Sequence, residues 1–208
     1  MVIPSDLSSQ TILMVGRGSD RLKRFDLGVE AMQHIIKEIP ECEMKIISDK
    51  YLIEYLEKII NLLNLGNNIK FMGYSPNPEI YYKNASLHIF PSISESFGLI
   101  LSETKIFGIP NILVGLDYVS ISRGGTVIIY DDNSISIAKE AIKILKDENY
   151  RKKLGREARK SMKKFNNELL LKKWIKLILS IYNGKNYYDN LREQDVKILE
   201  KDAINVIS

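Results

Sequence analysis

Residues 90–110 read FPSISESFGLILSETKIFGIP, and this stretch predicts a buried strand, a polar turn and a helix in succession. The apolar run ends at Pro91, the amphipathic segment begins near Ser96, and Gly108 followed by Pro110 ends it. A helix that starts directly after such a turn presents free backbone N–H groups at its first turn, and these groups bind anions. The stretch therefore predicts an anion site between a strand and a helix.

Two glutamates, Glu95 and Glu103, stand eight residues apart in this stretch. On a helix that spacing separates them by roughly 12 Å along the axis. The separation is too large for two carboxylates that hold one metal ion or act as acid and base on one bond. We expect them instead to contact two ends of one extended ligand.

Strands and helices alternate on both sides of this stretch. Short apolar runs predict six strands, at residues 11–16, 44–48, 69–72, 86–90, 111–114 and 126–130. Segments with helical spacing lie between and after them, at 25–38, 52–63, 79–83, 96–107 and 134–146, the last with Ser134 as its N-cap. This alternation predicts an α/β fold with a doubly wound, mostly parallel, six-stranded Rossmann-like sheet. After residue 148 the pattern is all helical, and it predicts a C-terminal flank of helices to 165 and over 167–182.

One domain is expected over residues 11–183, because 208 residues suffice for a single well-cored unit with a tail left over. Residues 1–10 are polar, with Pro4 and three serines, and are typical of a linker or a chain end. Residues 184–208 follow a Gly-Lys-Asn break, and we expect a tail with at most a short helix.

The composition is that of a soluble globular protein, with 45% hydrophobic and 27% charged residues. No apolar run reaches the length of a membrane span, and the first twenty residues lack the apolar core of a signal peptide. Cys42 is the only cysteine, which excludes an intrachain disulfide and favours a cytoplasmic location. We expect His34 and His88 to be structural. No catalytic triad, zinc-ligand spacing or Walker loop occurs, so neither a hydrolase nor a metalloenzyme is supported.

Positive charge is concentrated in one part of the chain. Residues 139–176 hold 14 Lys or Arg against 5 Asp or Glu, while the whole chain carries a net charge of only +4. A solvated helical face is the favoured interpretation, and peripheral contact with an anionic membrane through these basic helices is the alternative. Nucleic acid is disfavoured as a partner, because no stacking aromatics are interleaved with the basic residues.

The loops at the carboxyl ends of the predicted strands indicate the kind of ligand. Such sheets bind ligands beyond these ends, where this chain offers the cations Arg17, Lys23 and Arg24 together with glycines and the two glutamates. Cations and free amides suit phosphate, while carboxylates accept hydrogen bonds from sugar hydroxyls. A nucleotide sugar combines both chemistries.

A dinucleotide cofactor is the competing interpretation, because Gly16-Arg17-Gly18 follows the first strand and Asp49 ends the second. The full fingerprint needs a third glycine where this chain has Arg21, and the loop is crowded with charge where a pyrophosphate would approach the backbone. NAD(P) binding is therefore the weaker hypothesis.

Five motifs give the chain a family resemblance over residues 11–182. They are V-G-R (15–17), K-R-F-D-L (23–27), F-M-G-Y (71–74), E-S-F-G-L-I-L-S-E (95–103) and G-I-P (108–110). With these motifs the chain resembles the C-terminal, donor-binding domain of the retaining glycosyltransferases of family 4, which have the two-domain GT-B fold. The spacing of the two glutamates between a strand and G-I-P is the most specific part of this resemblance.

The resemblance implies a role for each matching residue. Arg17 and Lys23 would bind the donor diphosphate and stabilise the leaving nucleotide, so that no metal is required. Glu95 would contact the donor sugar and, with the two cations, complete the catalytic set, while Glu103 would hydrogen-bond the ribose. The donor-binding residues implied are Gly16, Arg17, Lys23, Gly73, Tyr74, Glu95, Ser96, Phe97, Gly98, Leu99 and Glu103, and the donor is a sugar nucleotide such as a UDP- or GDP-sugar. The alternative is that the four charged groups are ordinary solvated residues, and that Phe97 packs rather than stacks on a base.

Two motifs depart from the family pattern. Residues 103–110 read E-T-K-I-F-G-I-P where family members commonly have E-A-M-A-x-G-x-P, and residues 115–119 read G-L-D-Y-V where G-G-x-P-E is usual. The second segment normally borders the sugar and diphosphate, so its contacts are expected to differ here.

A GT-B enzyme also has an N-terminal domain of similar size that binds the acceptor. The resemblance therefore implies that this chain needs such a domain, in cis or in trans, and residues 167–182 are the candidate for the helix that packs on it. The function implied is transfer of a hexose-type sugar, with retention, to a glycan, lipid or polysaccharide acceptor, in the cytoplasm or at the inner face of the membrane. The alternative is a non-catalytic sugar-nucleotide-binding module or one subunit of a split transferase.

Overall fold

The computed structural model describes residues 2–17, 21–165 and 167–184, which fall into two compact units, Met1–Ser161 and Met162–Ser208. The first unit contains the sheet and the second contains the last described helix. Almost all of the tail predicted at 184–208 lies outside the described residues.

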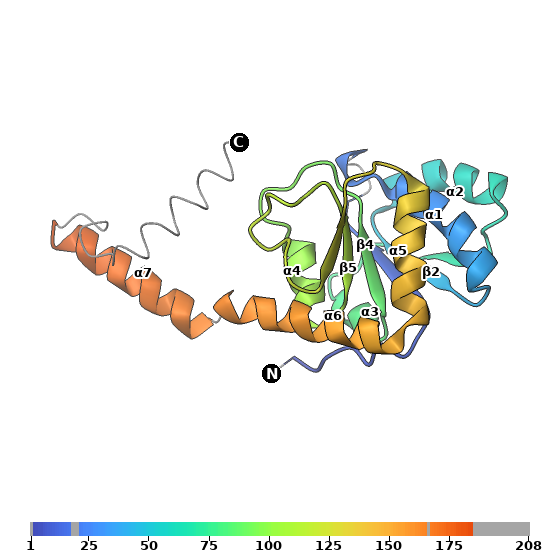
Figure 1. The fold of residues 1–208 in the computed structure, drawn as a ribbon. Coiled ribbons are helices and arrows are strands. Elements are labelled where there is room, and N and C mark those ends of the chain that lie inside the picture. Colours follow the sequence, from blue (N-terminus) through green and yellow to red (C-terminus); the bar gives the residue numbers. More distant parts are fainter. Residues whose placement is uncertain (1, 18–20, 166, 185–208) are drawn as a thin grey trace. The chain divides into compact units, whose positions relative to one another are not determined.

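Six parallel strands form one sheet in the first unit (Figure 1). Their order is β3-β2-β1-β4-β5-β6. Each strand pairs in parallel with its neighbours, as Met14 of β1 does with Ile46 of β2. The bounds are β1 Thr11–Val15, β2 Glu43–Ile47, β3 Ile69–Phe71, β4 Leu87–Phe90, β5 Asn111–Val114 and β6 Thr126–Ile129. This order reverses between β1 and β4, which is the doubly wound topology, and it confirms the predicted fold class.

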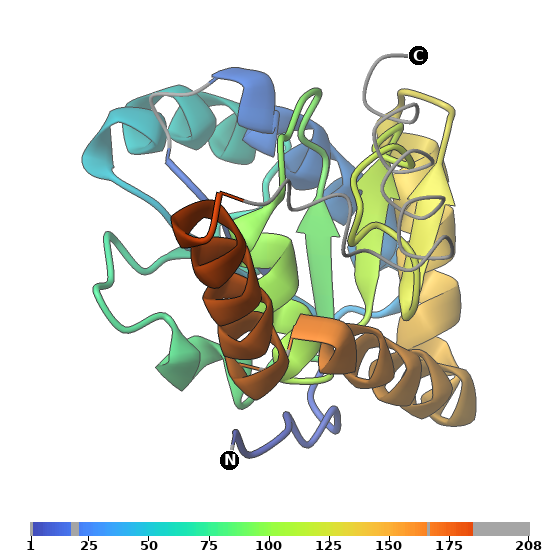
Figure 2. The same cartoon turned by 90° about the vertical axis from the view of Figure 1, so that its left-hand side faces the viewer.

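Helices cover both faces of the sheet: Figure 1 shows it nearly edge-on with helices on either side, and Figure 2 shows it nearly face-on with helices in front and behind. Alternate residues of β1 separate the two cores: Ile12 and Met14 face helices α1 (Phe25–Glu38), α2 (Ile53–Leu62) and α5 (Ser134–Lys146). Leu13 and Val15 face the smaller core beneath α3 (Glu79–Tyr82) and α4 (Leu99–Ile106). Short 3-10 turns, η1 (Arg21–Lys23) and η2 (Lys50–Leu52), complete the loops after β1 and β2. The central strands β1, β4 and β5 are buried on both faces, which explains their nearly continuous apolar sequence.

The helix α6 (Glu148–Ser161) ties the ends of this unit together. Its Arg151 is buried and donates hydrogen bonds to the carbonyl oxygens of Leu7, at 2.9 Å, and of Ile144 and Leu145 at the end of α5. Burial lowers the pKa of this guanidinium, which still carries its charge because an Arg pKa starts far above neutrality. Residues 2–10, whose composition is typical of a linker, pack on the same unit: Leu7 is buried and the Ser5 N–H donates to the Phe107 carbonyl at 2.8 Å.

The start of α4 differs from the sequence-based prediction. The helix begins at Leu99 rather than near Ser96, because Gly98 takes the left-handed conformation (φ 78°, ψ 63°) that ends the loop. Glu95 therefore lies in a loop, and the 12 Å separation expected for two glutamates on one helix does not apply. At α5 the N-cap is Asn133, whose side chain accepts from the Ser136 N–H, rather than the predicted Ser134.

The second unit contains the turn η3 (Met162–Phe165) and the helix α7 (Asn167–Tyr182). Lys172 and Glu168 form an ion pair of 2.9 Å along its polar side. Many of its apolar side chains are exposed, among them Leu169, Leu171, Trp174, Ile175, Ile178 and Ile181. Within the described ranges, no helix combines the length and the apolar character needed to cross a membrane.

Candidate functional site

A cleft of about 810 Å³ opens at the carboxyl ends of the strands, where the strand order reverses between β1 and β4. It is lined by Gly16 and Arg17 after β1, by Ser48 and Asp49 after β2, by residues after β3, and by the loop between β4 and α4. An open α/β sheet binds its ligand at this place, because the loops after β1 and β4 diverge there. The volume is that of a site for a ligand larger than a single sugar ring.

Two cations reach the cleft from the loop after β1. Arg17 is exposed, and among the described residues nothing accepts a hydrogen bond from its guanidinium or forms an ion pair with it. Lys23 follows in the turn η1, where its Nζ forms an ion pair with Glu95 Oε1 and lies 5.8 Å from the centre of the Phe90 ring. Arg24, the third cation predicted for this loop, does not line the cleft and pairs with Asp132 instead.

The loop between β1 and α1 also bears on the dinucleotide hypothesis. It covers residues 16–24 and includes η1, so α1 does not begin directly after the strand. The phosphate-binding turn of the dinucleotide fingerprint requires a helix that begins directly after the strand. The close approach of helix to strand is provided by Gly28 instead, where a Cβ would lie 2.3 Å from the Met14 sulfur. This geometry does not favour a dinucleotide cofactor.

Glu95 lines the cleft and is held by three partners. Its carboxylate accepts hydrogen bonds from Lys23 and, at 3.1 Å, from the Ser92 hydroxyl. Its backbone N–H donates to the Tyr118 hydroxyl, 3.2 Å away, in the loop after β5. Only 12% of its side chain is exposed, so this carboxylate is fixed in the cleft wall by its partners rather than by solvent.

Glu103 also lines the cleft, one turn into α4. Its Oε2 accepts a hydrogen bond of 2.8 Å from the Tyr82 hydroxyl. Tyr82 is buried, and its ring meets Phe107 edge to face with centroids 5.3 Å apart. Burial and the bond to Glu103 raise the Tyr82 pKa, so the phenol stays protonated and donates at every physiological pH.

The start of α4 supplies backbone donors between these two glutamates. The first helical hydrogen bond joins the Ser102 N–H to the Gly98 carbonyl at 3.0 Å, which leaves the N–H groups of residues 99–101 outside the helical ladder. Ser96, Phe97, Gly98 and Leu99 all line the cleft here. An anion in the cleft would meet both these amides and the two cations.

The structure thus brings together ten of the eleven residues predicted for donor binding. The exception is Gly73, which does not line the cleft, although its neighbour Tyr74 does and is 79% exposed. Among the lining residues that were not predicted for donor binding are Ser48, Asp49, Ser75, Pro78 and Ile100. Most of them follow β2 or β3, so the rule that ligands bind beyond strand ends would have found them. The Ser48 hydroxyl is buried and has no hydrogen-bond partner within the described part of the chain.

Other titratable groups lie in the core. His88 is buried, with Nδ1 2.7 Å from Asn111 Oδ1, and burial lowers its pKa to about 4. Cys42 is also buried, and burial raises the pKa of its thiol to about 12. Both residues are structural rather than reactive. Over residues 2–17, 21–165 and 167–184, no three His, Cys, Asp or Glu side chains are grouped so that they could hold a metal ion.

Comparison with known protein families identifies the chain. Residues 2–161, which include the whole sheet and every element around the cleft, match the family described as "Glycosyl transferases group 1". The chain belongs to this glycosyltransferase family. Because the match ends with α6, it leaves out the second unit.

Named relatives support this membership. The chain is 27% identical over 157 residues to a poly(glycerol-phosphate) alpha-glucosyltransferase of Bacillus subtilis, a match that covers 74% of the chain and 23% of the relative. It is 28% identical over 179 residues to a Campylobacter jejuni alpha-1,4-N-acetyl-D-galactosaminyltransferase that acts on an undecaprenol-linked glycan, and this match covers 83% of the chain and 49% of the relative. The chain therefore spans half or less of the length of these two group 1 glycosyltransferases.

Solved structures share the fold. The pneumococcal O-GlcNAc transferase GtfA, solved with UDP and GlcNAc, superposes with a TM-score of 0.74 at 22% identity, over 86% of this chain and 38% of that one. The C-terminal domain of the group 1 glycosyltransferase LpcC from Francisella tularensis gives a TM-score of 0.63 at 18% identity, over 77% of this chain and 86% of that one. The first unit thus has the fold of the C-terminal, Rossmann-like half of GT-B glycosyltransferases.

Proposed function

We propose that this chain is the donor half of a glycosyltransferase and that its cleft binds a nucleoside-diphosphate sugar. One observation carries the proposal: two separate segments, residues 16–24 and 95–103, bring two cations, two carboxylates and a helix start to one cleft at the point where the strand order reverses. Structures with the same fold contain UDP, as in GtfA and in the Anabaena protein HepE, which supports this choice of ligand.

The cations are assigned to the diphosphate. Arg17 has donors available and Lys23 is already in the cleft wall, so both would reach phosphate oxygens as charge-assisted donors. Lys23 also pairs with Glu95, and a bound diphosphate would take over part of that pairing. When the bond between sugar and phosphate breaks, negative charge develops on the leaving diphosphate, and these two residues would stabilise it without a divalent metal.

The glutamates are assigned to the two polyhydroxyl parts of the ligand. Glu103 would accept hydrogen bonds from the ribose, and the exposed Tyr74, which also lines the cleft, would border the base. Glu95, beside the diphosphate-binding cations, would accept hydrogen bonds from the donor sugar. The backbone N–H groups at the start of α4 would face the phosphates. We refer to the two regions as the Glu103 end and the Glu95 end.

The proposed reaction is transfer of a hexose-type sugar, with retention, to a glycan, lipid or polysaccharide acceptor. The relatives named above are about twice as long as this chain or longer, and their remaining length would provide an acceptor domain, in cis or in trans. A non-catalytic donor-binding module, or one subunit of a split transferase, has the same cleft. Transfer activity in the presence of the acceptor domain separates the enzyme from the non-catalytic module.

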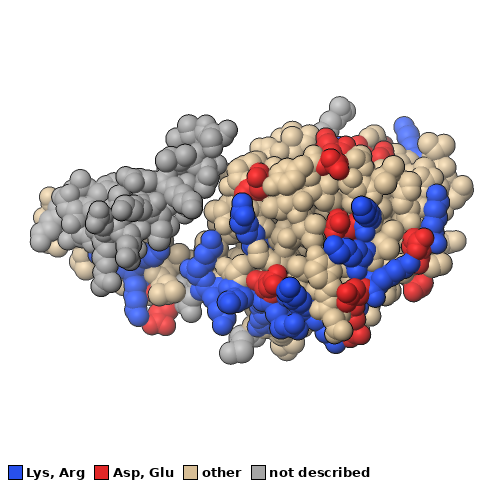
Figure 3. All heavy atoms as spheres, in the orientation of Figure 1, with Lys and Arg blue, Asp and Glu red and all other residues tan. Residues whose placement is uncertain are grey.

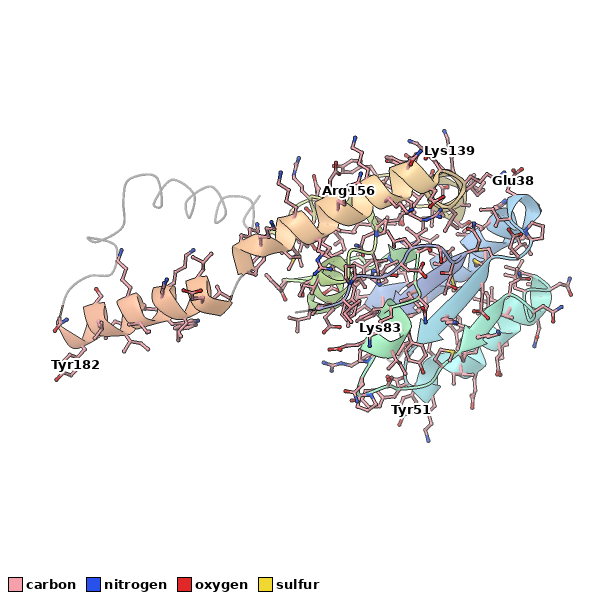
Figure 4. All side chains as sticks on the ribbon, turned by 90° about the horizontal axis from the view of Figure 1, so that it is seen from below. Glu38, Tyr51, Lys83, Lys139, Arg156 and Tyr182 are labelled. Carbon is pink, nitrogen blue, oxygen red and sulfur yellow. The ribbon has the colours of Figure 1, made fainter. Side chains whose placement is uncertain are left out.

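Contact with an anionic membrane surface is a second proposal for partners, and it would place the protein at the cytoplasmic face. Four exposed cations, Lys152, Lys153, Arg156 and Lys160, form a basic stripe along α6, where blue spheres gather in Figure 3. Figure 4 shows Arg156 and Lys139 along the same side of the first unit. The exposed surface of α6 carries less positive charge than the sequence suggests, because Arg151 is buried in the core. The test is co-sedimentation of the protein with phosphatidylglycerol vesicles. If reversing the charge of three residues of the basic stripe leaves co-sedimentation unchanged, the contact is refuted.

The test of donor binding is calorimetry of the chain with UDP, GDP and their sugars, in buffer that contains EDTA. We expect one of the nucleotides to bind in the micromolar to millimolar range without metal, and Arg17→Ala to weaken it by about tenfold or more through loss of a charge-assisted hydrogen bond. Lys58→Ala, which removes an exposed lysine from α2, is the matched control. The proposal is wrong if no nucleotide binds, or if both substitutions have the same small effect.

A further inference from the structure

Lys105 is a lysine on the buried side of α4, and its side chain reaches the loop that follows β5. The residue is 0% exposed. Its Nζ donates hydrogen bonds to the carbonyl oxygens of Ile121 and, at 2.8 Å, of Arg123. A buried ammonium group is costly unless such acceptors surround it, so loop and lysine require each other. We call residues 115–125 the anchored loop.

The anchored loop has a packed conformation of its own. Leu116, Val119, Ile121 and Ser122 are all buried within it. The Ser122 N–H donates to the Val119 carbonyl at 2.8 Å, and the Ser122 hydroxyl donates to the Asp117 carbonyl at 3.0 Å. A loop with this much internal packing moves as one piece, so a hold at residues 121 and 123 also fixes residues 117 and 118.

Tyr118 extends from the anchored loop to the wall of the cleft. Tyr118 is 40% exposed. Its hydroxyl accepts the hydrogen bond from the Glu95 N–H. Figure 1 shows the loops after β4 and β5 side by side above α4, as this contact requires. Two further partners of Glu95, Lys23 and Ser92, hold its carboxylate. Tyr118 is therefore the partner that holds its backbone.

We propose that Lys105 is a positioning residue: it holds the anchored loop, the loop places Tyr118, and Tyr118 fixes the backbone that carries the Glu95 carboxylate. The expected consequence at a donor sugar rests on the proposed function. Immobilisation of residue 95, the first step, needs no ligand. The inference assigns a use to a buried charge on α4 that does not line the cleft.

Two variants of the 208-residue chain test the first step. Tyr118→Phe removes the acceptor of the Glu95 N–H with little change in shape, and Lys105→Met removes the ammonium group but keeps the chain length. We expect the amide hydrogen of Glu95, followed by NMR, to exchange about 5- to 10-fold faster in both, which corresponds to one lost hydrogen bond. Tyr130→Phe is the matched control, because the Tyr130 hydroxyl contacts Asp117 of the same loop, at 3.3 Å, without touching Glu95.

The second step is tested by calorimetry of the same variants. Tyr118→Phe should reduce the extra affinity that a nucleotide sugar has over its free nucleotide by about fivefold, and leave the affinity for the free nucleotide within about twofold. Lys105→Met should act in the same direction, and the double variant should add little, because both act through one loop.

The outcomes separate the inference from the proposed function. An unchanged Glu95 exchange rate in either variant overturns the inference, and so does an equal loss for nucleotide and nucleotide sugar. Should Lys105→Met fail to fold, Tyr118→Phe still tests the contact on which the inference depends, and an unchanged exchange rate there overturns it. If the unaltered chain binds no nucleotide at all, the proposed function fails, whereas faster exchange in both variants would still show that Lys105 positions residue 95.

Discussion

The Glu103 end and the Glu95 end of the cleft present the same chemical group on different supports. Glu103 is part of α4 and is fixed by Tyr82, a buried side chain 21 residues away in sequence. Glu95 is part of a loop, and its partner Lys23 is 72 residues away, while Tyr118 comes from a third segment. The first end is built from a rigid element, and the second depends on contacts among loops. The difference indicates that the Glu95 end is the part of the cleft that can change between family members without loss of the fold.

The largest expected effect is a fall in the stability of the whole fold as the pH falls. It acts on both ends alike, and it sets the pH range in which they can be compared. His88 lies in β4, just before the loop that carries Glu95. Burial lowers its pKa to about 4, whereas an unfolded histidine titrates near 6.5. Between these values the unfolded chain binds the extra proton, so stability falls as the pH falls. We expect the free energy of unfolding to decrease by about 2 kcal/mol from pH 6.5 to 4.5, because the full slope of about 1.4 kcal/mol per unit applies only between the two pKa values.

Urea unfolding at several pH values checks this expectation. The range stops at pH 4.5, because carboxylates with lowered pKa, such as Glu43, lose their contribution below it. His88→Gln should lower the stability at pH 7 but flatten the dependence on pH. An equally steep dependence in that variant would show that another group is responsible. Binding at the two ends should be compared above pH 6.5, where His88 is neutral in both states.

The next effect distinguishes the two ends directly. Glu103→Ala should weaken binding of the free nucleotide by about tenfold, because it removes a carboxylate that accepts from the ribose. Glu95→Ala should leave free nucleotide binding nearly unchanged and reduce the gain in affinity that the sugar provides by about tenfold. Calorimetry with a nucleotide and its sugar, on both variants, measures these changes. Equal losses for both ligands in both variants would contradict the division between the ends.

Glu95→Gln is a useful companion to this comparison. The glutamine keeps the shape and one acceptor oxygen but no longer neutralises Lys23, so the lysine would be available to the diphosphate. We expect Glu95→Gln to bind free nucleotide slightly more tightly than the unaltered chain does. If Glu95→Gln and the unaltered chain bind it equally, the ion pair does not compete with the diphosphate.

The smallest effect tests whether Tyr82 holds the Glu103 end. Tyr82→Phe removes the hydrogen bond to Glu103 and keeps the ring that packs against Phe107. We expect about a fivefold loss of affinity for the free nucleotide and about 1 kcal/mol lower stability. Tyr81→Phe, at the neighbouring, half-buried position of α3, is the control and should change neither. A loss confined to the extra affinity that the sugar provides would contradict the hypothesis that Tyr82 supports the Glu103 end.

Much of the fold follows from the sequence because its signals are local. The bounds of the strands and of α1 are close to those predicted, since apolar periodicity and prolines mark them. The start of α4 was predicted wrongly, because a left-handed glycine three residues after Glu95 postpones the helix and only the backbone conformation shows it. For the same reason the sequence indicated the wrong geometry for the two glutamates.

The sequence indicated which residues line the site but not which of them contact one another. The residues that the family-like motifs single out, Arg17, Lys23 and both glutamates, all line one cleft. The pairing of Lys23 with Glu95, the hold of Tyr82 on Glu103 and the burial of Lys105 all join residues distant in sequence. Hydrophobic periodicity in the sequence does not predict such contacts, because they depend on how the loops meet in space. The donor-binding roles themselves stay predictions.

Trp174 has a consequence for how the protein can be observed. It is the single tryptophan of the chain, it lies on α7 in the second unit, and it is 61% exposed. Its fluorescence therefore reports the surroundings of α7, and an emission maximum that shifts to shorter wavelength would signal that something has covered this helix. Emission and calorimetry thus provide two separate channels, one for whatever binds α7 and one for whatever enters the cleft.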